Sequence, residues 1–325
     1  MTIDESRATP ESITMVDHHF GGPWTEIKLD AVCYYLGCYT KALSRKQFDL
    51  WYVDGFAGTG DRTNEKLTGG LLERQPMKWV TETLPGSAKR AMNIRPPFKH
   101  FIFNESDDEH QKALRAIKEA NELLDIEIIG DDANAAISES FSRPVWSRGA
   151  FGAARAVVFL DPYALQVNWS TLELLAKTQC VDVWYLFPLH DVTRQLANKR
   201  SGIGSKEKRL DKVLGEAWRE LYELPPPTNQ MFSQTLFGSI PEFAEEEYRK
   251  ATKAQIEAWF KARLETVFPY VSEPLPLFTE VNRQKFSLFL AVANKSAPAI
   301  DLARKFHRHV MKNYPPLASR RRSAH

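Results

Sequence analysis

Cysteine is scarce in this sequence, and long apolar runs are missing from it. Three of the 325 residues are cysteine (Cys33, Cys38 and Cys180), and no Cys-x-x-Cys pair is present. We therefore expect free thiols in a reducing compartment instead of a disulfide scaffold. The apolar runs reach only strand length, which predicts no membrane span. The first residues carry neither a basic nor an apolar segment, so we expect no signal peptide and a cytoplasmic location.

The sequence also has no large excess of positive or negative charge. The 43 basic and 41 acidic residues leave a net charge of +2. This balance does not identify a polyanionic partner, so any basic surface must be a local patch. The hydrophobic content of 43% and the length of the chain suit a globular protein with a sizeable buried core.

What the sequence does contain is a regular alternation of apolar blocks and helical patterns. The apolar blocks predict buried strands at 48–53, 98–104, 126–129, 155–160 and 181–187. Continuous apolar strands separated by helices indicate a parallel sheet that is covered on both faces. We therefore predict an α/β fold with a Rossmann-like, doubly wound, mostly parallel sheet.

The pattern changes along the chain and suggests five parts. They are an irregular lead-in (1–23), a Rossmann-like cofactor-binding part (24–187), an inserted helical subdomain (188–268), final strands and a helix completing the sheet (269–314), and a basic disordered tail (315–325). A late strand at 286–292 is expected to rejoin the first sheet. Residues 61–85 form a polar insertion within the cofactor-binding part.

The strongest local signal is a glycine-rich turn after the first strand. It consists of Asp54, Gly55, Phe56, Ala57, Gly58, Thr59 and Gly60. The dinucleotide pattern G-x-G-x-x-G fails, because Thr63 stands where its third glycine is required. A phosphate loop is excluded because no Gly-Lys-Ser/Thr follows, and the polar insertion replaces the helix that a diphosphate needs. The turn and Asp54 suit a cationic, amino-acid-bearing ligand; the alternative is a turn that is merely tight.

Acidic residues follow the next two strands. Glu105 at the end of the second strand is placed to accept hydrogen bonds from ribose hydroxyls, or else it is a solvated loop residue. Asp132 after the third strand can accept from an adenine amino group, while the small Ala133 leaves room for the base. The alternative for Asp132 is an N-cap of the next helix, and the two roles are compatible.

The fourth strand ends in Asp161, Pro162 and Tyr163. A carboxylate and a carbonyl at this point can accept hydrogen bonds from the amino group of a substrate, and Tyr163 can stack on a planar base. The alternative is an ordinary turn. We predict these three as the catalytic residues, because they can position an amino group and offer a carboxylate to it.

This order of motifs resembles that of the class I methyltransferases, which use S-adenosylmethionine and end their sheet with an antiparallel strand. More narrowly, the chain is similar to the three-Cys-motif partner (TcmP) family. The similarity lies in residues 17–22, 24–29, 52–60, 86–87, 130–134 and 161–163, in Trp169, and in residues 214–215 with Trp218. The resemblance implies S-adenosylmethionine as cofactor and a separate, three-Cys-motif protein similar to radical-SAM enzymes as partner.

These observations predict a methyltransferase that acts on nucleic acid. The expected cofactor-binding residues are Lys28, Asp54, Gly55, Phe56, Ala57, Gly58, Gly60, Glu105, Asp132 and Ala133, with Lys28 or Trp24 covering the cofactor. The basic residues Lys199, Arg200, Lys208 and Arg209 are candidates for phosphate contacts, or else a solvated helix face. The alternative function is a non-catalytic, cofactor-binding or scaffold subunit of the partner. No metal site is expected, because the adjacent His18 and His19 are unlike a converging ligand set.

Overall fold

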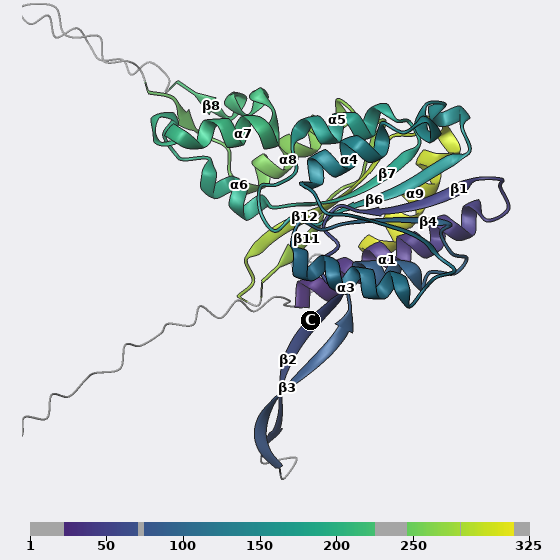
Figure 1. Ribbon diagram of the computed structural model, residues 1–325. Helices are drawn as coiled ribbons and strands as arrows, with labels where there is room; N and C mark the ends of the chain where they lie inside the picture. The colour runs from purple at the N-terminus through teal and green to yellow at the C-terminus, as the bar shows by residue number, and fades with distance from the viewer. Residues whose placement is uncertain (1–22, 71–74, 225–245, 280, 315–325) are drawn as a thin grey trace, which may run out of the picture.

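An eight-stranded sheet forms the centre of the molecule (Figure 1). The computed structural model describes residues 23–70, 75–224, 246–279 and 281–314. The strands are β1 (Asp49–Asp54), β4 (His100–Asn104), β5 (Asp125–Ile129), β6 (Ala154–Leu160), β7 (Val181–Phe187), β10 (Tyr270–Val271), β11 (Leu275–Phe278) and β12 (Gln284–Val292). Their order is β10-β12-β7-β6-β1-β4-β5, with β11 also pairing with β12. The pairings among β1, β4, β5, β6 and β7 are parallel. The predicted α/β fold with a mostly parallel sheet is confirmed.

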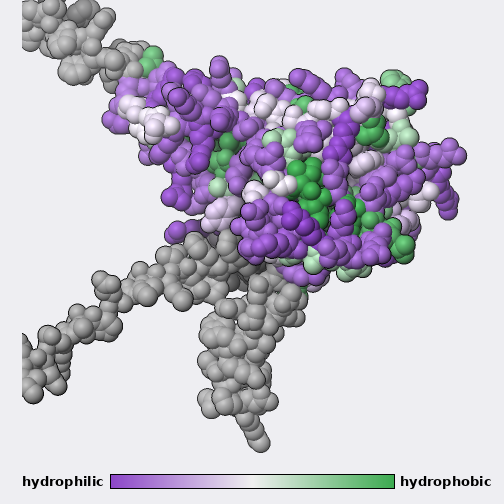
Figure 2. Space-filling model, viewed as in Figure 1, coloured by the Kyte–Doolittle hydropathy of each residue, from purple (hydrophilic) through white to green (hydrophobic). Residues whose placement is uncertain are grey.

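Helices cover both faces of this sheet. One layer holds α1 (Pro23–Leu43), α2 (Ser87–Met92), α3 (Asp108–Glu119) and α9 (Ala297–Asn313), and the other holds α4 (Ala133–Phe141), α5 (Trp169–Lys177) and α8 (Lys253–Glu265). Successive strand residues point to opposite faces, so Tyr52 packs in the core beneath α1 and Val53 in the core beneath α5. Figure 2 shows a mostly hydrophilic face with a hydrophobic patch between α3 and α4.

The late strand returns to the sheet as predicted. β12 pairs antiparallel with β7, with Ser287 opposite Phe187 and Val292 opposite Asp182. Its residues from Phe286 onward are buried. The antiparallel strand therefore lies between the parallel strands and β10, and its beginning lies at the carboxyl-terminal end of β7.

The polar insertion is a β-hairpin that projects from the body of the protein (Figure 1). Its strands are β2 (Asp61–Gly70) and β3 (Gln75–Pro85). The two ends of the hairpin meet, because the N–H of Gly86 donates to the carbonyl of Gly60 at 2.9 Å. Lys89 on α2 forms an ion pair with Asp61 at 2.5 Å. The hairpin therefore begins and ends at nearly the same point, and the insertion does not interrupt the main fold.

The region predicted as a helical subdomain contains α6 (Leu189–Gln195), α7 (Glu207–Leu214), the 3-10 helices η3 (Arg200–Gly202), η4 (Gly204–Lys206) and η5 (Glu216–Leu221), and also strands β8 (Tyr222–Glu223) and β9 (Tyr248–Arg249). Its core is continuous with that of the sheet: Phe260 of α8 stacks on Phe187 of β7 with ring centroids 3.8 Å apart. The remaining short helices are η1 (Pro144–Trp146) and η2 (Gly149–Phe151).

The five-part division of the chain stays a prediction. Most of the lead-in (1–22), part of the insertion (71–74), residues 225–245 and the tail (315–325) lie outside the described residues. Among the helices that are described, none is both long and apolar enough to cross a membrane.

Candidate functional site

Four loops meet at one edge of the sheet. They follow β1, β4, β5 and β6, which are neighbours in the order β5-β4-β1-β6. The register aligns the carboxyl-terminal ends of these strands: Asp54 lies opposite Phe103 of β4 and Phe159 of β6. Open α/β sheets bind ligands at this edge. The four predicted motifs are therefore brought together.

The glycine turn requires two of its glycines. Gly58 and Gly60 have φ of +59° and +75°, a backbone region that side chains disfavour. A Cβ on Gly60 would also lie 2.4 Å from Cδ1 of Ile117. Ala57 is buried, and its N–H donates to the carbonyl of Asn104 at 2.9 Å. The positive φ angles of the glycines and the backbone hydrogen bond of Ala57 thus determine the shape of the turn.

Asp54 lies beneath this turn. It is completely buried, with its oxygens accepting hydrogen bonds from the Phe56 N–H and the Tyr52 hydroxyl, both at 3.1 Å. Burial and, to a smaller extent, the negative charge of Asp161 raise its pKa to about 6, although the hydrogen bonds from Ser87, Phe56 and Tyr52 lower it. Asp54 therefore supports the turn from inside the protein, and a direct ligand contact, which the sequence led us to expect, stays a prediction.

The helix that the sequence placed far from the turn is close to it in space. As predicted, the insertion and not a helix directly follows the glycine turn, because β2 begins at Asp61. The hairpin then returns the chain to Gly60, and α2 begins there. Gly86 precedes α2 and hydrogen-bonds Gly60, and the Ser87 side chain hydrogen-bonds Asp54. The strand–turn–helix unit is therefore complete in three dimensions.

Glu105 is fixed against the glycine turn. One carboxylate oxygen accepts from the Gly58 N–H at 3.0 Å, and the other accepts from the Asp107 N–H at 2.9 Å. The ring of His110 lies 3.8 Å from the first oxygen. The side chain is 14% exposed, so the carboxylate is held in place and still reaches the surface. Further lone pairs remain on each oxygen for a ligand.

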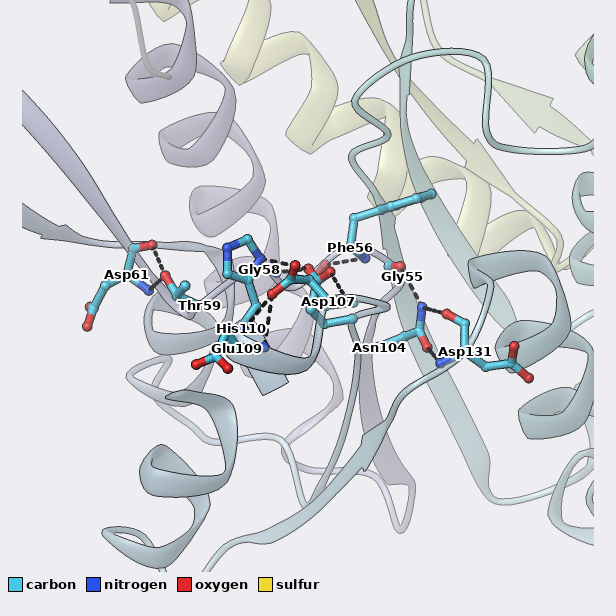
Figure 3. Close-up of polar contacts among 12 residues, drawn as sticks. Gly55, Phe56, Gly58, Thr59, Asp61, Asn104, Asp107, Glu109, His110 and Asp131 are labelled. Carbon is cyan, nitrogen blue, oxygen red and sulfur yellow. Dashed lines mark hydrogen bonds and ion pairs between the residues drawn. The ribbon is translucent and has the colours of Figure 1, made fainter. Parts of the chain in front are cut away.

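Asn104 is a residue that the sequence reading missed. Its amide donates to the carbonyls of Gly55 and Asp131, each at 3.1 Å, and so joins the loops after β1 and β5 (Figure 3). Asn104 is 3% exposed and ends strand β4 directly after three apolar residues. A polar residue at the end of an apolar strand was the available signal.

Asp132 is the N-cap of α4. Its side chain accepts from the backbone N–H groups of Asn134 and Ala135, at 3.0 and 3.3 Å. The N-cap interpretation is confirmed, and the adenine contact stays a prediction. Ala133 is buried behind the cap, and Asn134 continues to the next loop, where its oxygen accepts from the Asn168 N–H at 2.8 Å.

Asp161 is paired with Lys28. The Lys28 ammonium donates to Oδ2 of Asp161, and the two side chains are 4% and 23% exposed. The same ammonium lies 5.1 Å from the centre of the Trp24 ring. Lys28, predicted to cover the cofactor, is thus attached to the predicted catalytic carboxylate through a contact that spans 133 residues of sequence.

Of the other two predicted catalytic residues, one lies in the interior and one at the surface. Pro162 is buried, whereas Tyr163 is 66% exposed. The Tyr163 N–H donates to the side-chain oxygen of Gln166 at 2.9 Å, which closes the loop. The phenol ring therefore lies at the surface directly beside Asp161.

The predicted phosphate-binding residues lie in the region between β7 and α8, which follows the carboxyl-terminal end of β7. Lys199 and Arg200 form ion pairs with Glu246 at 2.8 Å and Glu247 at 2.5 Å. Lys208 and Arg209 are exposed on α7. The nucleic-acid role of these four residues stays a prediction, and two of them already carry acidic partners.

Comparisons with known proteins were made at the levels of family, sequence and structure. No protein-family model matches the chain, and no curated protein matches it. A DUF519 protein from Legionella pneumophila is similar in structure, with 11% identity, a TM-score of 0.47, and coverage of 92% of this chain and 95% of that one. An S-adenosylmethionine-dependent methyltransferase from Clostridium acetobutylicum has 11% identity, a TM-score of 0.34, and coverage of 81% and 92%. The function proposed below therefore rests on the site itself.

Proposed function

We propose that this protein is an S-adenosylmethionine-dependent methyltransferase. The observation that carries this proposal is the Glu105 carboxylate, held against the glycine turn by the Gly58 N–H, with the Lys28–Asp161 pair on the other side of β1. A carboxylate in this position suits the two hydroxyls of a ribose, and the turn suits the amino-acid end of the cofactor. Asp132 and Ala133 would border the adenine.

In the proposed mechanism the protein's own residues position the acceptor and accept its proton. S-adenosylmethionine supplies an electrophilic methyl group when it is bound. Asp161 accepts a hydrogen bond from the N–H of the acceptor, orients the nitrogen lone pair and stands ready to take the proton. Lys28 stabilises the charge on that carboxylate, and Tyr163 offers a face for a planar base. We further propose a nucleic-acid acceptor, a cytoplasmic location and a three-Cys-motif protein as partner, the last from the TcmP resemblance alone.

A second function is favoured by one observation. Because Asp161 already has Lys28 as its counter-ion, the pair also suits a purely structural role. In that case the protein would bind the cofactor as a non-catalytic subunit of its partner. Radiolabelled methyl transfer to DNA, RNA and protein, with and without the partner, separates the two: cofactor binding without transfer in any mixture supports the subunit.

Cofactor binding is tested by calorimetry with S-adenosylmethionine on the wild type and on Glu105→Gln. Loss of a charged hydrogen-bond acceptor is expected to weaken binding by about ten- to a hundredfold, or about 1.5–3 kcal/mol. Glu109→Gln is the matched control, because Glu109 is 77% exposed and pairs only with Lys112 among the described residues. Equal affinity in the two variants would remove Glu105 from the site.

A further inference from the structure

A cluster of lysine and aromatic side chains lies beside Asp161, between the start of α1 and the start of β12. We call it the cation–aromatic patch, and it consists of Trp24, Lys28, Lys285 and Phe286. The Trp24 and Phe286 rings are 4.9 Å apart between centroids. The ammonium groups of Lys28 and Lys285 lie 5.1 and 5.6 Å from the centre of the Trp24 ring. The Trp24 ring therefore contacts both cations.

The sheet register places this patch at the same edge as the candidate site. Ser287 lies opposite Phe187, the last residue of β7, so Lys285 extends past that end of the strand. The parallel neighbour of β7 is β6, which ends immediately before Asp161. Lys285 thus stands on the far side of Asp161 from Glu105 and the glycine turn.

The two lysines of the patch differ in whether an acidic side chain pairs with them. Lys28 is neutralised by Asp161. Lys253, on α8 nearby, donates inward to the backbone carbonyl of Gln284. Lys285 is half-buried over the Trp24 and Phe286 rings, and no carboxylate in the described part of the chain forms an ion pair with it. An ammonium in contact with rings and without an anion is suited to an external anion.

Resting on the proposed function, we infer that the patch binds the sugar–phosphate backbone of a nucleic-acid acceptor, with Lys285 contacting the phosphate beside the nucleotide that Asp161 and Tyr163 receive. Phe286 is buried and supports the Trp24 ring, which is partly exposed, while Tyr163 is 66% exposed. An ammonium beside accessible aromatic rings is the combination of groups that holds single-stranded nucleic acid. This assignment differs from the prediction at Lys199 and Arg200, whose charges are matched by Glu246 and Glu247.

The test is fluorescence anisotropy with short labelled single-stranded DNA and RNA, measured at several salt concentrations. Lys285→Gln is expected to lower the affinity about three- to tenfold at low salt and to reduce the slope of log K against log salt by about 0.7, the value for one phosphate contact. Lys285→Arg keeps the charge and should bind like the wild type. Lys46→Gln is the matched control, because Lys46 is exposed and precedes β1 at the opposite edge of the sheet.

Equal salt slopes for Lys285→Gln and Lys46→Gln would overturn the inference, as would a wild-type protein that binds neither oligonucleotide. Displacement of the oligonucleotides by polyglutamate at equal charge would overturn it too and would assign Lys285 to an acidic protein partner. The cofactor affinity of the same proteins separates the two proposals. A wild-type protein that binds S-adenosylmethionine but neither oligonucleotide rejects only this inference. A wild-type protein that does not bind S-adenosylmethionine rejects the proposed function.

Discussion

The two halves of the binding edge are built in different ways. On the side of β1, β4 and β5, backbone amides and carbonyls set the geometry: Gly58 donates to Glu105, and Asn104 bonds the carbonyls of two loops. On the side of β6, β7 and β12, side chains set it, through the Lys28–Asp161 pair and the rings around Trp24. The geometry of the first half therefore depends mainly on backbone conformation, whereas that of the second half depends on individual side chains.

Substitution of Gly60 is the strongest way to break the first half. Gly60→Ala combines a positive φ with a Cβ at 2.4 Å from Ile117, so we expect a loss of about 3 kcal/mol in the free energy of unfolding. Gly58→Ala is the matched control, because it has a positive φ but open space around a Cβ, and should cost about 1 kcal/mol. Urea denaturation measures both, and equal losses would mean that the contact with Ile117 is unimportant.

Asp54 gives the same half a dependence on pH. Burial raises its pKa from 3.8 to about 6 in the folded protein. A raised folded-state pKa means that its contribution to stability is complete below pH 3.8 and is lost as the pH rises toward 6. The loss is about 1.4 kcal/mol per pH unit, or about 3 kcal/mol across this window.

Asp54→Asn removes the titrating group and keeps its shape. Between pH 4 and pH 7 the wild type should therefore lose about 3 kcal/mol more stability than the variant, as measured by denaturant unfolding at each pH. Asp49→Asn is the control, because Asp49 is partly exposed and pairs with Lys99 at the other end of β1. A wild type and an Asp54→Asn variant with parallel pH profiles would contradict the assignment.

The contrast between the halves also explains what the sequence could predict. Glycines that require a positive φ, apolar strands and acids at strand ends leave local signals, so the strands, the glycine turn and the position of Glu105 were found. The Lys28–Asp161 pair and the return of the chain from Gly86 to Gly60 depend on contacts across 133 and 26 residues. Such contacts leave no local pattern, and for this reason the sequence predicts the helix after Gly86 but neither its position beside the turn nor the pairing of Lys28 with Asp161.

Lys28 is the residue at which the two halves can be separated experimentally. Lys28→Met removes the counter-ion of Asp161 and leaves the glycine turn unchanged. We expect methyl transfer to fall about a hundredfold, which corresponds to about 2.7 kcal/mol, while the affinity for S-adenosylmethionine changes less than about threefold. Lys89→Met is the matched control, because it removes a more exposed ion pair with Asp61 at the base of the hairpin. If Lys28→Met instead weakens cofactor binding and leaves turnover intact, Lys28 belongs to the cofactor half, as the sequence alone suggested.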